Sequence, residues 1–210
     1  FLSTREEQGK KLIQDVCGQD IKVEVLCDPT YLLSKQEWEE RIPTKQMLDE
    51  KYVLCYLIGN DVTQKMCAKR YAQKHGLKLV ALMSNESVSE IDMTFPDLNI
   101  MGAGPVDFIN WIRGSVCFFT DSFHGLAFSV IHEKQFYVFY RHKSGAEKSR
   151  NSRIDNIIDM WGVKERLIVD EKRDWDSYIE VPVDYKSVSE KVAQKREEGL
   201  SYLKCALTFN

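Results

Sequence analysis

The sequence predicts an α/β fold built on a Rossmann-like, mainly parallel sheet with helices on both faces. From residue 52 onward, short apolar runs alternate with segments whose apolar residues recur at helical spacing, as in repeated strand and helix units. Runs 116–119 and 136–140 are apolar at nearly every position, as expected of parallel strands buried on both faces. A chain of 210 residues, 43% of them hydrophobic, can bury one sizeable core and carry an appendage.

The first fifty residues predict two short helices and one short strand. Residues 4–7 have the pattern of a capping box, and the helix after them is expected to end at Gly18. Residues 21–26 are predicted to form a strand. A second capping-box pattern, at 34–37, begins another helix, which Pro43 ends.

A composition change after this region predicts a domain boundary. The polar residues 44–51 resemble a linker, and the regular alternation begins directly after them. We therefore expect residues 1–45 to be a residual segment of an N-terminal domain with its linker. Residues 46–210 are expected to form a Rossmann-like C-terminal domain that ends in a long helix. The chain lacks an initiator Met and begins almost at once with a helix cap, so we expect a piece of a longer protein.

Strands and helices then alternate along the rest of the chain. The predicted strands are residues 52–58, 77–83, 116–119, 136–140 and an edge strand at 167–169. The predicted helices begin at Asp61, Pro105, Ser122, Arg153 and Tyr185. Residues 84–99 are expected to be a long polar loop.

Charge and cysteine content exclude several classes of function. The 29 basic and 32 acidic residues give a net charge of −3, so no overall field favours nucleic acid or a membrane surface. No apolar segment approaches the roughly 20 residues that a transmembrane helix needs, and the start does not resemble a signal peptide. The six cysteines form no CxxC pair, which favours buried thiols in the cytoplasm over disulfides or a metal site. No cofactor is expected.

The turn after residues 116–119 carries the strongest candidate for chemistry. Ser122 and His124 follow a strand and open a helix, at the sheet edge where α/β proteins bind ligands and helix amides favour anions. A structural interpretation stays open, because a lone His is often a packed residue and Asp121 or Ser122 can simply cap the helix. We expect an accessible His124 ring if the site is functional.

Basic residues crowd the next connection between a strand and a helix, and most of them are expected to be solvated. Arg153 differs because it lies in the first turn of a helix, where the helix dipole disfavours a cation unless an anion is near. Two glycines at 102 and 104 could cradle a phosphate, but a tight turn is the simpler interpretation.

Five short blocks, taken in order, resemble the polysaccharide pyruvyl transferase family. They are Arg5-Glu6-Glu7, Asp28-Pro29-Thr30, Gly104-Pro105-Val106-Asp107-Phe108, Thr120-Asp121-Ser122-Phe123-His124-Gly125 and Asn151-Ser152-Arg153-Ile154. The match resembles the C-terminal part of the family only. It implies a fold similar to the C-terminal domain of a GT-B glycosyltransferase, in which two Rossmann-like domains face a cleft.

The resemblance also implies an activity. Family members transfer a pyruvyl group from phosphoenolpyruvate to sugar hydroxyls of a glycan or a lipid-linked sugar, in cell-surface polysaccharide biosynthesis. His124 matches the active-site histidine, Arg5 matches an arginine that holds the donor, and Ser122 and Arg153 match recurrent positions. Leu126 departs from the small or hydroxylated residue of many members, so no acceptor is inferred. Half of a cleft enzyme is expected to be inactive alone and to leave an apolar face that a homodimer could cover.

Two other interpretations remain open at this point. A glycosyltransferase of the same architecture would use a nucleotide sugar and would need an acidic residue to hold the ribose, for which Glu133 is the nearby candidate. A non-catalytic α/β binding module would leave His124 buried among core residues.

Overall fold

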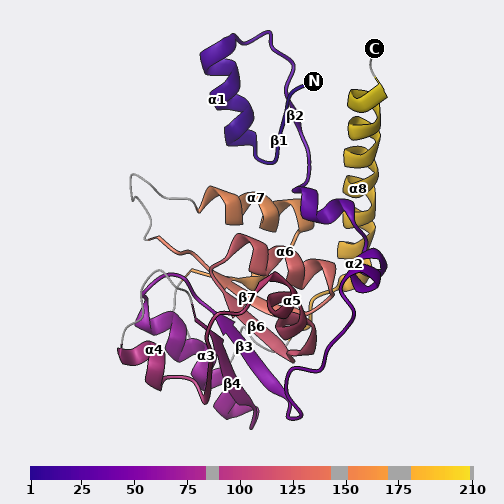
Figure 1. The fold of residues 1–210 in the computed structure, drawn as a ribbon. Coiled ribbons are helices and arrows are strands. Elements are labelled where there is room, and N and C mark those ends of the chain that lie inside the picture. The colour runs from indigo at the N-terminus through magenta and orange to yellow at the C-terminus, as the bar shows by residue number, and fades with distance from the viewer. Residues whose placement is uncertain (84–89, 143–150, 170–180, 209–210) are drawn as a thin grey trace.

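The computed structural model describes residues 1–83, 90–142, 151–169 and 181–208. Its main feature is a six-stranded, fully parallel sheet in the order β5-β4-β3-β6-β7-β8 (Figure 1). This confirms the predicted Rossmann-like architecture. The strand order reverses between β3 and β6, because the chain moves from β3 to one side of the sheet and later returns to the other.

The described elements have the following bounds. The strands are β1 Ser3–Thr4, β2 Glu24–Val25, β3 Tyr52–Tyr56, β4 Lys78–Leu82, β5 Leu98–Ile100, β6 Cys117–Thr120, β7 Gln135–Phe139 and β8 Leu167–Ile168. The α-helices are α1 Glu7–Cys17, α2 Lys35–Arg41, α3 Val62–Lys74, α4 Glu90–Thr94, α5 Pro105–Gly114, α6 Phe123–Ile131, α7 Ser152–Trp161 and α8 Tyr185–Thr208. Two 3-10 helices, η1 Pro29–Leu32 and η2 Lys164–Arg166, complete them.

The alternation of side chains along each strand builds a core on both faces of the sheet. In β3, Tyr52 and Leu54 belong to one buried cluster, which α5, α6, α7 and α8 cover. Val53 and Cys55 point to the other face and join a second cluster with Ala68 of α3. The central strands β4, β3, β6 and β7 are therefore apolar at most successive positions, which is the pattern that predicted a parallel sheet.

Two local predictions are wrong, and packing explains both. Residues 84–99 are not one loop, because α4 and β5 lie in their second half; residues 84–89 lie outside the described part. β5 is only three residues long and half-exposed, so its apolar signal is weak. The capping box at residues 4–7 does not form either. Thr4 instead pairs with Val25 in a two-stranded parallel sheet, and α1 begins after Glu6 without a side-chain cap.

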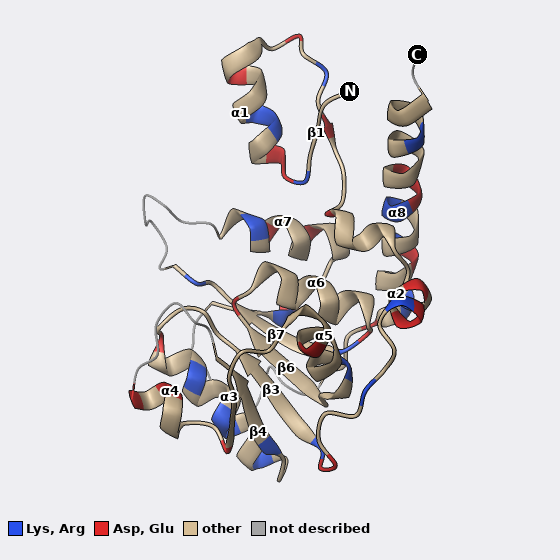
Figure 2. Cartoon of the chain, in the orientation of Figure 1, with Lys and Arg blue, Asp and Glu red and all other residues tan. Residues whose placement is uncertain are grey.

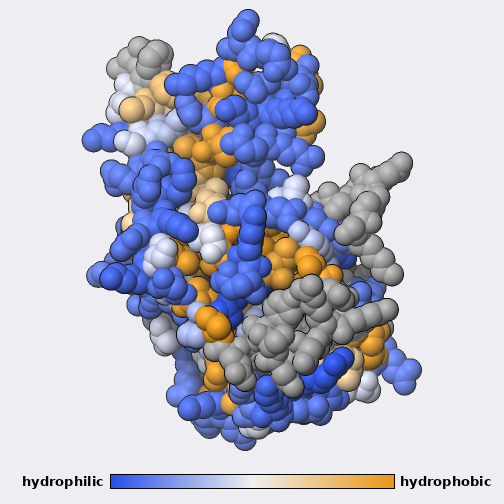
Figure 3. Space-filling view, turned by 180° about the vertical axis from the view of Figure 1, so that it is seen from behind, coloured by the Kyte–Doolittle hydropathy of each residue, from blue (hydrophilic) through white to orange (hydrophobic). Residues whose placement is uncertain are grey.

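The N-terminal segment and the end of α8 expose apolar side chains. α1 buries none of its residues in the described structure, and Leu12 and Val16 are 59% and 83% exposed. Leu203 and Leu207 are similarly open on α8, and the space-filling view shows apolar atoms among hydrophilic ones in this part of the molecule (Figure 3). No helix among the described residues has the length and apolar character needed to cross a bilayer.

A buried histidine near α2 makes stability depend on pH. His132 is 4% exposed, and neither ring nitrogen has a hydrogen-bond partner among the described residues. Burial, with further repulsion from Arg113, Lys35 and Lys134, lowers the pKa of His132 to about 3. The unfolded chain binds this proton near pH 6.5, so it binds more protons than the folded chain between pH 6.5 and 3. Stability should therefore fall as the pH drops through this window.

We expect His132→Phe to remove this dependence, because phenylalanine keeps the ring that stacks on Phe128 and has no titrating group. Urea unfolding should show the wild type losing about 2 kcal/mol between about pH 7.5 and 5 through this residue, and the variant lacking that loss. His75→Gln, at an exposed histidine on the end of α3, is the control and should leave the pH dependence intact. Equal slopes for wild type and His132→Phe would contradict the assignment.

Candidate active site

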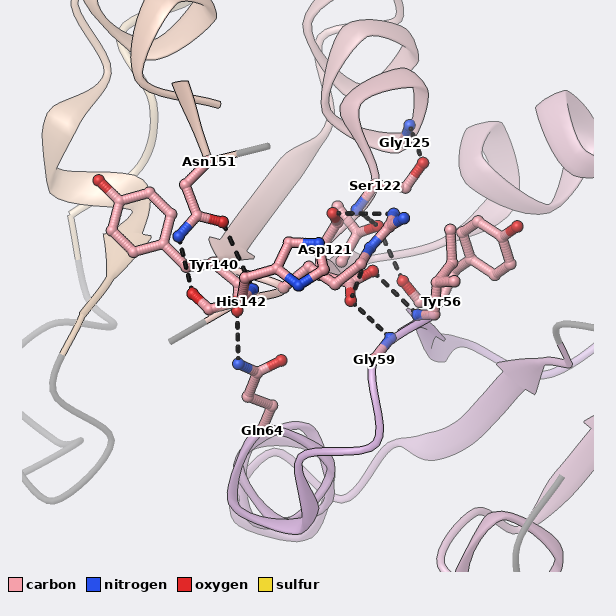
Figure 4. A network of polar contacts seen from close by, with 12 residues as sticks. Tyr56, Gly59, Gln64, Asp121, Ser122, Gly125, Tyr140, His142 and Asn151 are labelled. Atoms are coloured by element: carbon pink, nitrogen blue, oxygen red, sulfur yellow. Dashed lines mark hydrogen bonds and ion pairs between the residues drawn. The ribbon is translucent and has the colours of Figure 1, made fainter. Parts of the chain in front are cut away.

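The candidate site lies at the carboxyl edge of the sheet, beside the point where the strand order reverses. Open α/β sheets bind ligands in the crevice outside this point. Here the turn between β6 and α6 supplies Thr120, Asp121 and Ser122, and it lies directly against the loop after β3. The Thr120 hydroxyl donates to the Tyr56 carbonyl at 2.8 Å and accepts from the Ser122 amide at 3.0 Å (Figure 4). The turn is thus tied to the neighbouring strand.

The Asp121 carboxylate links the β6–α6 turn to the loop after β3 across this crevice. Its two oxygens accept from the Ile58 and Gly59 amides at 2.9 and 2.8 Å (Figure 4). Arg141 adds an ion pair, with its Nε 3.5 Å from Asp121 Oδ2. The Asp121 side chain is fully buried, so protein amides and Arg141, rather than water, compensate its carboxylate. A β-carbon on Gly59 would lie 3.1 Å from Asp121 Oδ2, which explains a small residue there.

Ser122 acts as the cap of α6. Its hydroxyl accepts from the Gly125 amide at 3.3 Å, and the residue is 7% exposed. The structural interpretation of this serine therefore has direct support. Gly125 has no room for a side chain, because a β-carbon would lie 2.7 Å from Thr120 Oγ1.

His124 lies exposed on the first turn of α6, as expected for a functional residue. Its ring packs edge-on against the Phe123 ring, with centroids 5.3 Å apart. Within the described part of the chain, the imidazole has no hydrogen-bond partner. A solvent-facing ring at a helix N-terminus can take or give a proton to a bound ligand.

Arg5 reaches the same place from the N-terminal segment. Its guanidinium carbon lies 4.6 Å from the centre of the Phe123 ring, a cation–π contact. Arg5 Nη1 donates to Asp28 at 2.6 Å, and the Arg5 carbonyl accepts from the Asn156 side chain of α7 at 2.9 Å. Arg5 and His124 therefore contact the same aromatic ring, although they lie far apart in the sequence.

Arg153 has the nearby anion that its position predicted, and that anion is Glu6. Arg153 Nε and Arg5 Nε each lie 3.4 Å from the same oxygen, Glu6 Oε1. The carboxylate joins the start of α1 to the first turn of α7. Figure 2 shows basic segments at the turn before α1 and at the start of α7, on facing sides of this junction. The two arginines are thus held close together with one carboxylate between them.

Two hollows meet at Arg153. A pocket of about 60 Å³ is lined by Asp121, Phe123, Arg141, His142, Asn151, Arg153 and Ile154. A wider, more open groove of about 310 Å³ is lined by Thr4, Arg5, Glu6, Gln8, Gly9, Leu12, Ser152 and Arg153. Arg5 and Arg153 form a cationic strip along the groove, and Arg153 also lines the pocket. Glu6 pairs with both arginines, so an anion bound here would compete with this carboxylate for them.

The structure joins Arg5 to Arg153 through Glu6 and places Arg5 on the Phe123 ring, which His124 also contacts. His124 itself lines neither hollow, and Ser122 faces inward as a cap. Arg141, one of the basic residues in the connection after β7, also lines the pocket, and the sequence pattern alone does not single it out. The ribose-binding candidate is wrong: Glu133 follows the far end of α6 and pairs with Lys35 at 2.7 Å. In the described residues, no group of three or more acidic, histidine or cysteine side chains could hold a metal ion.

Comparisons with known proteins agree with this fold. The family model for polysaccharide pyruvyl transferases matches residues 1–143, which is more than half of the chain. No curated protein matches the sequence. Among solved structures, UDP-GlcNAc 2-epimerase from Methanocaldococcus jannaschii matches with a TM-score of 0.55 and 12% identity, over 93% of this chain and 55% of the epimerase.

A second solved structure, the glycotransferase of kitacinnamycin, matches with a TM-score of 0.50 and 10% identity, over 91% of this chain and 57% of that protein. The chain thus spans a little more than half of the length of these structures. At this identity the likeness shows the fold alone, a Rossmann-like unit of the GT-B kind.

Proposed function

Because the chain belongs to the polysaccharide pyruvyl transferase family, we propose that it carries the donor site of an enzyme that moves a pyruvyl group from phosphoenolpyruvate to sugar hydroxyls. The observation that supports this most is the meeting of Arg5 and His124 on the Phe123 ring, with Arg153 joined to Arg5 through Glu6. A donor with a phosphate and a carboxylate needs several cations around one reacting centre. The cationic strip offers them beside an exposed imidazole.

The proposed chemistry gives each group a distinct role. His124 protonates the methylene carbon of phosphoenolpyruvate, which leaves an oxocarbenium-like centre that a sugar hydroxyl attacks. Arg5 and Arg153 bind the donor's anionic groups and stabilise the phosphate as it leaves. A second hydroxyl of the same sugar then displaces phosphate, so the product is a cyclic ketal. The acceptor in this proposal is a glycan or a lipid-linked sugar, met in the cytoplasm.

We also propose a division into two domains, on the resemblance to two-domain members of the family. Residues 1–45 would belong to the N-terminal half of the enzyme and residues 46–210 to the C-terminal half. Arg5 would then act from the N-terminal side of the cleft. The exposed apolar side chains of α1 and α8 would pack against the rest of the N-terminal domain or against a second copy.

Thermal-shift measurements on the full-length protein, with each candidate ligand in turn, test the proposal. Saturating phosphoenolpyruvate should raise the melting temperature, because a ligand that binds only the folded state stabilises it by about 2.7 kcal/mol at about 100 times its Kd. UDP-GlcNAc should give a smaller shift or none. Arg5→Gln should abolish the phosphoenolpyruvate shift, whereas Arg70→Gln, at an exposed arginine of α3, should keep it. A shift with UDP-GlcNAc alone would favour a glycosyltransferase instead.

A further inference from the structure

Arg5 is held in place by a carboxylate that the proposed chemistry does not use. Asp28 lies between β2 and η1, and its Oδ2 accepts from Arg5 Nη1 at 2.6 Å. The Asp28 side chain is 6% exposed, while the Arg5 side chain is 30% exposed. The buried partner therefore anchors the more open one. Residues 5 and 28 come from different turns, so only the folded segment brings them together.

The second oxygen of Asp28 is engaged locally. Asp28 Oδ1 accepts from the Thr30 amide at 3.1 Å and from the Thr30 hydroxyl at 2.9 Å, which caps η1. The two carboxylate oxygens thus differ in what they bind, since Oδ1 holds the turn and Oδ2 holds the arginine. The capping role and the role toward Arg5 are separable by mutation.

The turn that carries Asp28 is itself fixed to the core. The neighbouring Cys27 thiol lies 3.4 Å from the Lys195 carbonyl of α8. Tyr31 of η1 is 1% exposed, and its hydroxyl accepts from the Trp161 indole of α7 at 2.9 Å. These contacts fix the position of the Asp28 backbone, so the Asp28 carboxylate can hold the Arg5 guanidinium in one orientation.

The charge state of Asp28 suits this role. Burial of the Asp28 carboxyl opposes ionisation, but hydrogen bonds from Thr30 and Arg5 outweigh it, so the pKa of Asp28 lies below its usual value. At neutral pH the group is a buried anion facing the guanidinium. Charge-assisted bonds of this kind fix orientation as well as adding energy.

We propose that Asp28 is a positioning residue that holds the Arg5 guanidinium against the Phe123 ring, next to His124, so that Arg5 meets an anionic donor group in one orientation. The inference rests on the proposed function. Among the described residues, hydrogen bonds and ion pairs engage Arg5 through Nη1 and Nε, and Nη2 has no partner. Nη2 is the atom left for the ligand.

Two matched variants of the full-length protein test this role. Asp28→Asn keeps an oxygen for Thr30 but loses the charge that pairs with Arg5. Thr30→Val loses the hydroxyl bond to Asp28 and leaves Arg5 untouched. Calorimetric titration with phosphoenolpyruvate should show affinity weakened about tenfold or more in Asp28→Asn, since small misplacements of a binding group cost up to about 100-fold. Thr30→Val should stay within about twofold of wild type.

An NMR measurement without ligand separates this inference from the proposed function. The Arg5 Nη1–H resonances, which report on the bond to Asp28, should be protected from exchange in the wild type and in Thr30→Val, and exposed in Asp28→Asn. If the wild type does not bind phosphoenolpyruvate, the proposed function fails, and the Nη1–H resonances alone decide the positioning role. Unchanged Nη1–H resonances in Asp28→Asn, or equal losses of affinity in both variants, would overturn the inference.

Discussion

His124→Ala in the full-length enzyme should lower turnover by two or more orders of magnitude and leave the free energy of unfolding nearly unchanged. Loss of a general acid or base typically costs about 100-fold to 10,000-fold in rate. The imidazole is exposed and packs edge-on against the Phe123 ring, so its removal costs little buried surface. A large loss of rate without a loss of stability is the signature of a chemical role.

The control is His75→Ala, since His75 is also exposed but lies at the end of α3, on the other face of the sheet. It should retain full turnover with phosphoenolpyruvate and an acceptor. Activity of His124→Ala within a few-fold of the wild type would show that His124 does not transfer the proton. The cationic strip of Arg5 and Arg153 could then still bind the donor, so a titration with phosphoenolpyruvate should accompany the assay.

Asp121→Ala should destabilise the protein by about 3 to 5 kcal/mol. Hydrogen bonds to a charged group contribute about 1.5–3 kcal/mol each, and this carboxylate accepts two from the Ile58 and Gly59 amides. The substitution also leaves Arg141 beside a neutral methyl group. Urea unfolding measures the effect. Because the same carboxylate joins the β6–α6 turn to the loop after β3, we expect His124 to lose its fixed placement as well.

Asp61→Ala is the matched control, because Asp61 also accepts from a backbone amide at this sheet edge. It caps α3 through the Thr63 amide at 2.8 Å, and loss of such a cap costs about 1 kcal/mol. Asp121→Asn should fall between the two, since it retains one acceptor oxygen. A cost for Asp121→Ala no larger than for Asp61→Ala would mean that the Asp121 network adds nothing beyond an ordinary cap.

The two capping-box patterns show how far local sequence reasoning extends. Ser34 and Glu37 form the complete box, and α2 begins where the pattern predicted. Thr4 and Glu7 have the same spacing, yet Thr4 joins β1 and its hydroxyl donates to the Glu6 carbonyl at 2.9 Å. The difference arises because Thr4 pairs with Val25 of β2. Since β2 follows α1 in the sequence, residues 4–7 alone do not indicate this pairing.

The sequence by itself determined the parallel sheet, the domain-like alternation after residue 52 and the place of His124 at the end of β6. These depend on short-range physics: apolar periodicity, turn residues and the rule that parallel strands end at one edge. Only the tertiary structure decided that Arg5 stacks on Phe123, that Glu6 joins Arg5 to Arg153, and that Asp28 anchors Arg5. Several of these contacts join residues more than 100 positions apart in the sequence, and they arise from how the N-terminal segment packs on α6 and α7 rather than from any pattern along the chain.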